Sequence, residues 1–300
     1  MTILQAITAE PWAIMPSYLH VIAALAQRDH ASPALREHQE WSRRDGETLL
    51  QSMASAVTGR RMEGARYAMV TDQGVAIIPV YGPIFPRANI ITEYSGGASA
   101  QMLQADYRLA LNHNEVEAVL WVFDTPGGAA SGVNALADAI HAGAAKKRTE
   151  AYVAGAAASA GYWLASQAKR ISAERTGMVG SIGVVAAVPK QVEAGNDGVM
   201  TVEIVSSNAP NKRPDPTTDD GKQQIRTMLD AIEAQFIADV ARGRGVKTER
   251  VIEAYGQGGM LIGSDAVAAG MIDKIQSFEA CFDEIAQAVS SARRVKKLAR

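Results

Sequence analysis

The chain has 300 residues, of which 47% are hydrophobic and 21% charged, and its 30 Lys and Arg against 32 Asp and Glu leave a net charge of −2. This composition is typical of a globular protein with a sizeable core, and it excludes a mainly disordered chain. The balanced charge argues against nucleic acid as a partner. The single cysteine, Cys281, excludes an intramolecular disulfide and a zinc site built from several cysteines.

No targeting, membrane or metal-binding pattern is found. Residues 1–16 lack the Lys and Arg of a signal peptide. The longest uncharged run, 151–168, is rich in Ala, Gly and Ser and too weakly hydrophobic for a membrane span. The five histidines have no metal-ligand spacing. We therefore expect a cytoplasmic protein that has no membrane contact and needs no metal or cofactor.

Residues 1–66 are predicted to form a helical accessory segment. Apolar residues recur at helical spacing over Met15–Ala26, and the pair Ser32–Pro33 predicts the start of a charged helix that ends near Ala56. Residues 58–66 are basic and polar, as expected of a linker.

From Tyr67 onwards, strand and helix patterns alternate. Strands are expected over residues 75–80, 118–123, 151–153, 178–179, 183–185, 200–205 and 260–262, with further short ones near 171 and 271–275. Helices are expected over residues 99–111, 131–145, 160–168, 189–196, 217–242, 248–255 and 277–288. This alternation predicts an α/β domain with largely parallel strands over residues 67–290. The basic tail, 291–300, is expected to be a solvated helix end, with docking to an acidic partner or DNA as the alternative.

A serine stands among small residues in Ala157–Gly161 (AASAG), where a strand is expected to give way to a helix. Such a junction exposes the serine Oγ and aims the first N–H groups of the helix at whatever binds beside it. Ser159 is therefore a candidate nucleophile. A serine that merely caps a tightly packed helix fits the same residues.

Two glycines follow the expected strand 118–123, in Asp124–Gly128 (DTPGG). Without a Cβ, they allow a turn that exposes its N–H groups to a ligand. Acyl transfer needs two such donors at the developing oxyanion. An ordinary turn between a strand and a helix would contain the same residues.

A serine nucleophile also needs a base. All five histidines precede residue 142, and the least unsuitable, His141, falls within an expected helix. Lysine serves as a base when burial favours its neutral amine. Lys212 lies in a polar loop after an expected strand and could return to Ser159, although most lysines are simply solvated. Ser181, in the run GSIGV, is a candidate for orienting the amine, or else a turn serine.

Four motifs, in this order and spacing, resemble the signal peptide peptidase A family of serine peptidases. They are Asp124–Gly128 (DTPGG), Gly155–Tyr162 (GAAASAGY), Thr176–Val184 (TGMVGSIGV) and Ile262–Asp273 (IGSDAVAAGMID). The likeness covers about residues 75–285. It implies a Clp-protease/crotonase-like fold, here with the accessory helical N-terminal segment.

The resemblance also implies a Ser/Lys dyad with Ser159 as the nucleophile. In the single-domain members of this family the lysine follows about fifty residues later, which selects Lys212, 53 residues on, rather than Lys190 or Lys222. Ser181 is expected to contact the lysine.

The oxyanion hole is likewise assigned by resemblance. One donor is expected from Gly127, with Gly128 as its neighbour, and the second from the N–H of Ala160. A peptide substrate is expected to bind as an added β-strand beside the two glycines.

Near the start of the chain, Glu10–Ile14 (EPWAI) is similar to the head-maturation proteases of tailed phages and prophages, the viral branch of the family. This similarity implies an endopeptidase that processes scaffold, portal or capsid proteins in the bacterial cytoplasm, within the assembling prohead. The family resemblance further implies a homo-oligomer.

Three alternatives stay open at this point. A cellular peptidase that degrades cleaved signal peptides would use the same chemistry. A catalytically inactive assembly protein on this fold would be expected to have lost Ser159 or Lys212, and both are present. A crotonase-type acyl-CoA enzyme would be expected to place a carboxylate at the oxyanion pocket.

Overall fold

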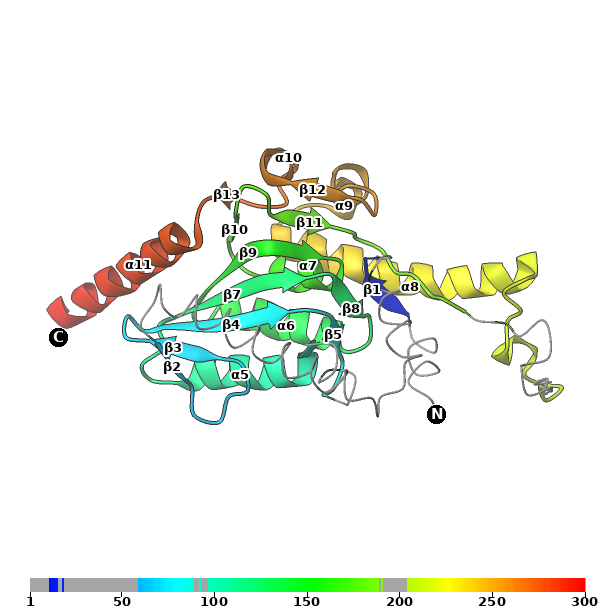
Figure 1. Cartoon of the computed structure of the whole chain (residues 1–300), viewed down its shortest axis with the longest axis horizontal. Helices are drawn as coiled ribbons and strands as arrows, with labels where there is room; N and C mark the ends of the chain where they lie inside the picture. Colours follow the sequence, from blue (N-terminus) through cyan, green and yellow to red (C-terminus); the bar gives the residue numbers. More distant parts are fainter. Residues whose placement is uncertain are drawn as a thin grey trace, which may run out of the picture.

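Strands and helices alternate in the computed structural model, which describes residues 11–15, 18, 59–88, 92, 97–188, 190 and 204–299 (Figure 1). The strands are β1 (Trp12–Ile14), β2 (Gly59–Arg61), β3 (Met69–Thr71), β4 (Val75–Tyr81), β5 (Ile84–Phe85), β6 (Ala98–Ser99), β7 (Ala118–Thr125), β8 (Gly127–Ala129), β9 (Arg148–Ala158), β10 (Ile171–Ala173), β11 (Met178–Gly180), β12 (Met260–Ile262) and β13 (Lys274–Ile275). The helices are α5 (Ala100–Asn112), α6 (Val133–Ala144), α7 (Ala160–Ala165), the short 3-10 helix η1 (Pro210–Lys212), α8 (Asp219–Arg244), α9 (Thr248–Ala254), α10 (Gly263–Ala269) and α11 (Phe278–Leu298).

The described strands form two sheets. The larger has the order β12-β11-β9-β7-β4-β3-β2, with β10 also beside β9 and β13 beside β10. Its central strands β4, β7, β9, β10 and β11 run parallel, while β2, β3 and β12 are antiparallel to their neighbours. The smaller sheet has the order β1-β8-β5-β6. The expected α/β fold with largely parallel strands is confirmed.

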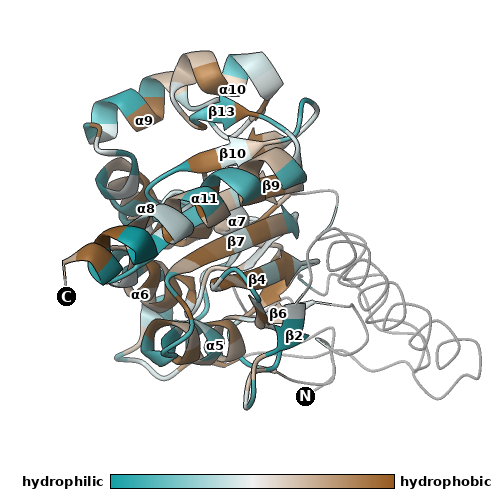
Figure 2. Cartoon of the chain, turned by 90° about the vertical axis from the view of Figure 1, so that its left-hand side faces the viewer, coloured by the Kyte–Doolittle hydropathy of each residue, from teal (hydrophilic) through white to brown (hydrophobic). Residues whose placement is uncertain are grey.

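The central strand β7 is apolar on both faces because helices cover both faces of the large sheet. Trp121 and Phe123 are fully buried in the core that α5, α6, α7 and α8 share with the sheet. Leu120 and Val122 point the other way and pack against α11, including Phe282. Figure 2 shows the apolar colouring of β4 and β7, with α5, α6 and α8 to one side of these strands.

The structure differs from the expectation near the N-terminus. Residues 12–14, expected within a helical segment, form β1, and residues 59–61, expected in a linker, form the edge strand β2. The physical reason is strand pairing, since β1 lies against the distant β8 and β2 lies antiparallel to β3, the next strand in the chain. The helices expected over 15–26 and 32–56 lie outside the described residues, apart from Met15 and Tyr18.

Expectations for residues 189–205 fall largely outside the described residues as well. Of the helix expected over 189–196, only Lys190 is described. Of the strand expected over 200–205, Ile204 and Val205 are described and lie outside regular structure, and Ile204 is 93% exposed. The described end of that segment is therefore not part of the core.

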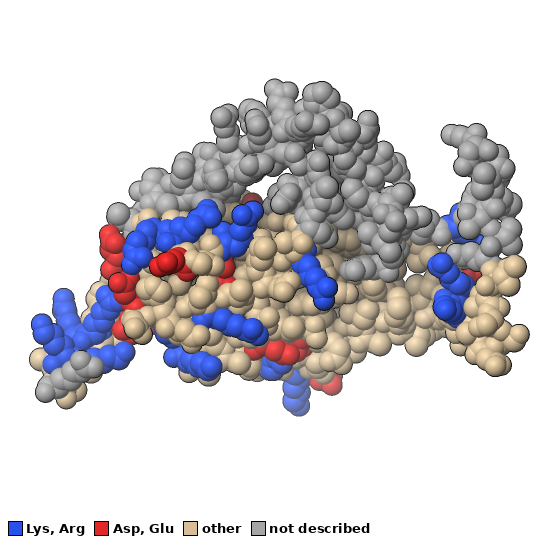
Figure 3. Space-filling model, turned by 90° about the horizontal axis from the view of Figure 1, so that it is seen from below, with Lys and Arg blue, Asp and Glu red and all other residues tan. Residues whose placement is uncertain are grey.

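The basic tail is the exposed end of α11, as expected (Figure 3). This helix runs through Leu298, ten residues beyond the expected end. Arg293 and Lys296 reach back to Glu117, which ties the helix to the rest of the chain. Among the described residues, no helix combines the length and the apolar character needed to cross a bilayer.

Candidate active site

Ser159 joins the end of β9 to the start of α7 in an unusual backbone conformation. Its φ is 50° and its ψ is −115°, a region that L-residues with a side chain rarely adopt. The Ser159 N–H donates to the Gly180 carbonyl at 2.7 Å, because β9 and β11 pair with Ala158 opposite Gly180. A strained turn between a strand and a helix is the setting in which hydrolases present a nucleophilic serine.

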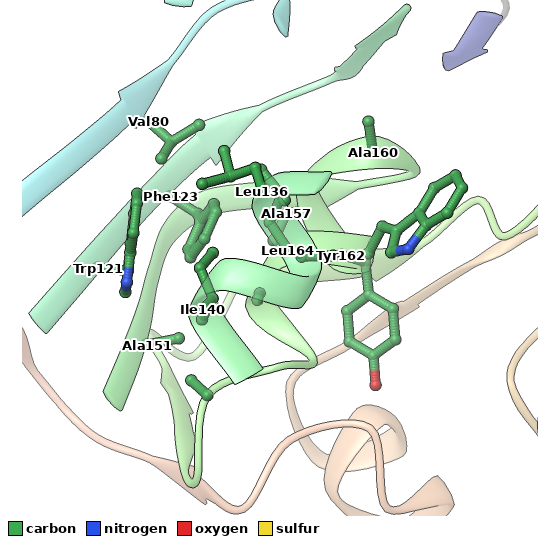
Figure 4. Close-up of a cluster of buried hydrophobic side chains, with 14 of the residues drawn as sticks. Val80, Trp121, Phe123, Leu136, Ile140, Ala151, Ala157, Ala160, Tyr162 and Leu164 are labelled. Atoms are coloured by element: carbon green, nitrogen blue, oxygen red, sulfur yellow. The ribbon is translucent and has the colours of Figure 1, made fainter. Parts of the chain in front are cut away.

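Helix α7 holds this turn in place through large buried side chains. Trp163 stacks on Phe236 of α8 with ring centroids 4.5 Å apart, and its Nε1–H donates to Asp239 at 2.8 Å. The Tyr162 hydroxyl donates to the Met271 carbonyl at 2.9 Å, and burial raises its pKa well above the ordinary value. Figure 4 shows the Tyr162 side chain pointing away from Trp121 and Phe123 of β7. Ser159 therefore sits on a rigid scaffold.

The glycine turn after β7 lies beside Ser159. Gly127 has φ 101°, and a Cβ there would lie 3.0 Å from the Ala158 carbonyl oxygen, so the turn contacts the residue that precedes the serine. Gly128 is equally constrained, since its Cβ would lie 2.6 Å from the Ile84 nitrogen. Only glycine fits at either position.

The side chain of Thr125 holds this turn. Its hydroxyl donates to the Gly82 carbonyl at 2.6 Å and accepts from the Gly127 N–H at 3.2 Å. The Gly127 N–H, which the family resemblance implies as an oxyanion donor, is thus already engaged by the Thr125 side chain. As the first residue of α7, Ala160 has no partner within the helix for its N–H.

Asp124 shapes the same end of β9, a role that the sequence did not reveal. Its carboxylate accepts from the Ala156 N–H at 3.1 Å, where the pairing of β7 with β9 shifts register. A Cβ on Gly155 would lie 2.8 Å from the Asp124 Cγ, so the glycine makes room for the carboxylate. Burial, together with the negative charge of Asp124, raises the pKa of Tyr81 across the strand pair.

Ser181 lies one residue after β11, across from Ser159. It also has a positive φ, 53°, and its N–H donates to the Gly259 carbonyl at 2.7 Å. The following turn reaches the nucleophile candidate, because the Gly183 carbonyl is 3.5 Å from the Ser159 Oγ. The two serines thus occupy neighbouring strand ends.

Lys212 stands apart from this cluster. It ends η1 and is exposed. Residues 204–218 lie beyond the N-terminal end of α8, away from α7 (Figure 1). Lys190 forms an ion pair with Asp215, which lowers the pKa of that carboxyl to about 2. The structure therefore brings Ser159, Ser181, Ala160 and the turn at Gly127 together and leaves Lys212 outside.

Among the described residues around Ser159 no metal site is found, and Ser159 itself is buried. Within the described ranges, no group of three or more His, Cys, Asp or Glu side chains is arranged to hold a metal ion. Ser159 has no exposed surface. Its hydroxyl is therefore closed to solvent in this structure.

Residues 141–292, just over half of the chain, match the sequence profile of peptidase family S49. The chain belongs to peptidase family S49. This assignment confirms the family expected from the four motifs, and the mixed α/β sheet is accordingly the Clp-protease-like fold of the family.

Relatives of this S49 chain include phage and bacterial proteins. The head-tail preconnector protein GP5 of Enterobacteria phage P21 is 24% identical over 96% of the chain and 58% of its own length. The capsid assembly protease C of Escherichia phage lambda is 26% identical over 77% of the chain and 53% of its own length. Protease 4 of Haemophilus influenzae is 28% identical over 72% of the chain and 35% of its own length. The chain thus spans between about a third and three fifths of these relatives, and the expected viral branch is confirmed by the two phage proteins.

Proposed function

We propose that the chain is a serine endopeptidase with Ser159 as its nucleophile. The observation that carries the proposal is the strained backbone of Ser159 between β9 and α7, beside the glycine turn, in a chain of peptidase family S49. Neither a helix cap nor a packing serine requires a positive φ. The strain is better explained by the orientation of a reactive hydroxyl.

In the proposed reaction, the Ser159 Oγ attacks the scissile carbonyl while Lys212 accepts its proton. The oxyanion forms between the N–H groups of Gly128 and Ala160. Lys212 then gives its proton to the leaving amine, and an acyl-enzyme ester remains on Ser159. Water, deprotonated by the same amine, attacks the ester and releases the acid and the free serine. Ser181 is proposed to orient the lysine amine.

The position of Lys212 requires a further step before this chemistry. A lysine base works as the free amine, which burial favours, and Lys212 lies on an exposed loop. We propose that the loop packs against the Ser159 site when several copies of the chain assemble. The homo-oligomer expected from the sequence would supply the covering surface.

A complementation experiment tests the dyad. Wild type, Ser159→Ala and Lys212→Met are each incubated with an unfolded protein substrate, and products are detected by mass spectrometry. Each variant is expected to lose activity by about 10³-fold or more. Restored activity in a mixture of the two variants would show that one copy supplies the lysine to its neighbour. Wild-type rates from Lys212→Met would refute this base.

We further propose that the substrates are proteins of phage head assembly. Support comes from the two phage relatives, whose names refer to a head-tail preconnector and to capsid assembly. The match to the phage P21 protein covers 96% of the chain, whereas the match to Protease 4 covers 72%. This wider coverage favours the phage role over a cellular one.

Purified scaffold, portal and capsid proteins of a tailed phage would test this role. The wild-type chain should cleave at least one of them at a defined bond, and Ser159→Ala should leave all of them intact. Cleavage of free signal peptides with none of the head proteins cut would favour the cellular alternative instead. No cleavage of any substrate would favour an inactive assembly protein.

A further inference from the structure

Strand β1 is held by backbone hydrogen bonds along both of its edges. On one edge it pairs antiparallel with β8, where the Met15 N–H donates to the Pro126 carbonyl at 2.9 Å. On the other edge, Trp12 and Val185 exchange two hydrogen bonds of 2.8 Å each. Residues 11–15 therefore fill a position for one extended strand between β8 and Val185, which we call the β1 position (Figure 1).

Both walls of the β1 position belong to the candidate active site. Strand β8 contains the glycine turn, and Val185 follows two residues after Gly183, whose carbonyl lies 3.5 Å from the Ser159 Oγ. The Ala13 carbonyl oxygen and the Ala158 carbonyl oxygen both lie within 3.0 Å of the place where a Cβ of Gly127 would stand. The segment thus lies next to the residue that precedes the nucleophile.

The register of this pairing places a peptide carbonyl at the proposed oxyanion donor. Hydrogen-bonded pairs alternate along an antiparallel ladder. Bonds at Met15 with Pro126 and at Pro11 with Ala130 make Ala13 with Gly128 the hydrogen-bonded pair between them. The carbonyl of Ala13 therefore faces the Gly128 N–H, as the carbonyl of a bound substrate would.

We propose that β1 is a tethered competitor of the peptide substrate. A substrate adds as an extended strand in the same position, and it does so only after residues 11–15 have left. This inference rests on the proposed peptidase function. Because backbone groups hold both edges, a foreign segment in extended conformation can make the same hydrogen bonds.

The side chains of β1 indicate what kind of segment fits. Trp12, Ala13 and Ile14 are each no more than 3% exposed. The Trp12 ring meets the Phe85 ring edge-on, with centroids 6.0 Å apart. The Ala13 side chain has no exposed surface, and its partner across the strand pair is Gly128. The substrate class is accordingly an extended apolar peptide, with a large aromatic residue followed by a small one.

A reversible disulfide tests the proposal in the full chain. Trp12 and Val185 form a hydrogen-bonded antiparallel pair, whose Cα atoms stand about 5.5 Å apart, within the range for a disulfide. The double variant Trp12→Cys/Val185→Cys is oxidised with diamide and then reduced with dithiothreitol. The native Cys281 is buried and does not compete. The two single variants, given the same oxidant, are the matched controls.

Two measurements compare the oxidised chain, in which the disulfide holds β1 in place, with the reduced chain. One is hydrolysis of an unfolded protein substrate, and the other is the fluorescence anisotropy of a labelled peptide of residues 9–18. Locking β1 is expected to slow hydrolysis and weaken peptide binding by about tenfold or more, because the covalent bond replaces a tether of millimolar effective concentration. Reduction is expected to restore both, and neither single variant should respond to the oxidant.

Two results would overturn the proposal. If the disulfide does not form, β1 does not occupy its position beside Val185. If it forms and the oxidised chain binds the peptide and hydrolyses the substrate as the reduced chain does, β1 does not block the site. If no form of the chain hydrolyses any substrate, the proposed function fails. The labelled peptide then decides by itself whether β1 occupies a peptide site.

Discussion

Replacing Thr125 by valine should separate hydrogen bonding from packing at the glycine turn. The Thr125 side chain is buried, and its hydroxyl bonds to the Gly82 carbonyl at 2.6 Å and to the Gly127 N–H at 3.2 Å. Valine keeps the shape and removes both bonds. A buried donor left unsatisfied costs about 1–3 kcal/mol, so the lost pair should lower the free energy of unfolding by about 2–4 kcal/mol.

Serine at the same position is the matched control. It keeps the hydroxyl and loses the methyl Cγ2, which packs close to Gly161. One buried methyl is worth about 1 kcal/mol. If the hydrogen bonds dominate, Thr125→Val is the less stable variant, whereas if packing dominates, Thr125→Ser is.

Thermal unfolding followed by circular dichroism provides the measurement. Thr125→Val should lower Tm by about 5–10 °C, and Thr125→Ser by less. The valine variant should also lose substrate hydrolysis by about tenfold or more, since a displaced oxyanion donor no longer meets the carbonyl. A valine variant as stable and active as wild type would refute the role assigned to the threonine hydroxyl.

Three further predictions concern burial and sterics. Gly128→Ala should lower the free energy of unfolding by about 1–3 kcal/mol and abolish hydrolysis, because the new Cβ would lie 2.6 Å from the Ile84 nitrogen. Burial raises the pKa of Cys281 to about 11, so less thiolate forms at pH 8. Iodoacetamide should therefore react about a hundredfold more slowly with the folded chain than with the unfolded chain. Asp273→Asn should cost about 2–4 kcal/mol in urea unfolding, since it removes the carboxylate that pairs with the nearly buried Arg244.

Each of these predictions has a control or a contradicting outcome. The control for Gly128→Ala is Gly245→Ala, whose new Cβ would meet no atom within 4 Å. This variant should lower the free energy of unfolding by only about 1 kcal/mol, because Gly245 has a φ of 66°. Asp219→Asn removes an exposed ion pair with Lys222 and should change stability by less than about 0.5 kcal/mol. Equal alkylation rates for folded and unfolded chains would contradict the burial of Cys281.

The sequence predicts those parts of the fold that local pattern determines. The apolar run of β7 identifies a buried strand, and Ser99 caps α5 by accepting from the Met102 N–H at 3.4 Å, as its position suggested. The family motifs likewise single out Ser159 and Ser181 as candidates, and the structure places them at neighbouring strand ends. Each of these features depends on residues close in the chain or on a family pattern.

Features that depend on distant partners could not be predicted in this way. The three residues of β1 carry no strand pattern of their own, and their conformation comes from pairing with β8 and Val185, more than a hundred residues later. The role of Thr125 depends on the carbonyl of Gly82, which no local rule identifies. The sequence does not predict the exposure of Lys212 either, because a polar loop can pack against a site or extend into solvent.

The most direct test of the account is the capture of the acyl-enzyme on Ser159. The full chain is incubated with an activated peptide ester, digested with trypsin and examined by tandem mass spectrometry across residues 149–169, which also contain the buried Ser166 as an internal control. We expect an acyl group on Ser159 and none on Ser166, with no adduct in Ser159→Ala. An adduct that persists in Ser159→Ala, or hydrolysis without any acylated Ser159, would contradict the assigned nucleophile.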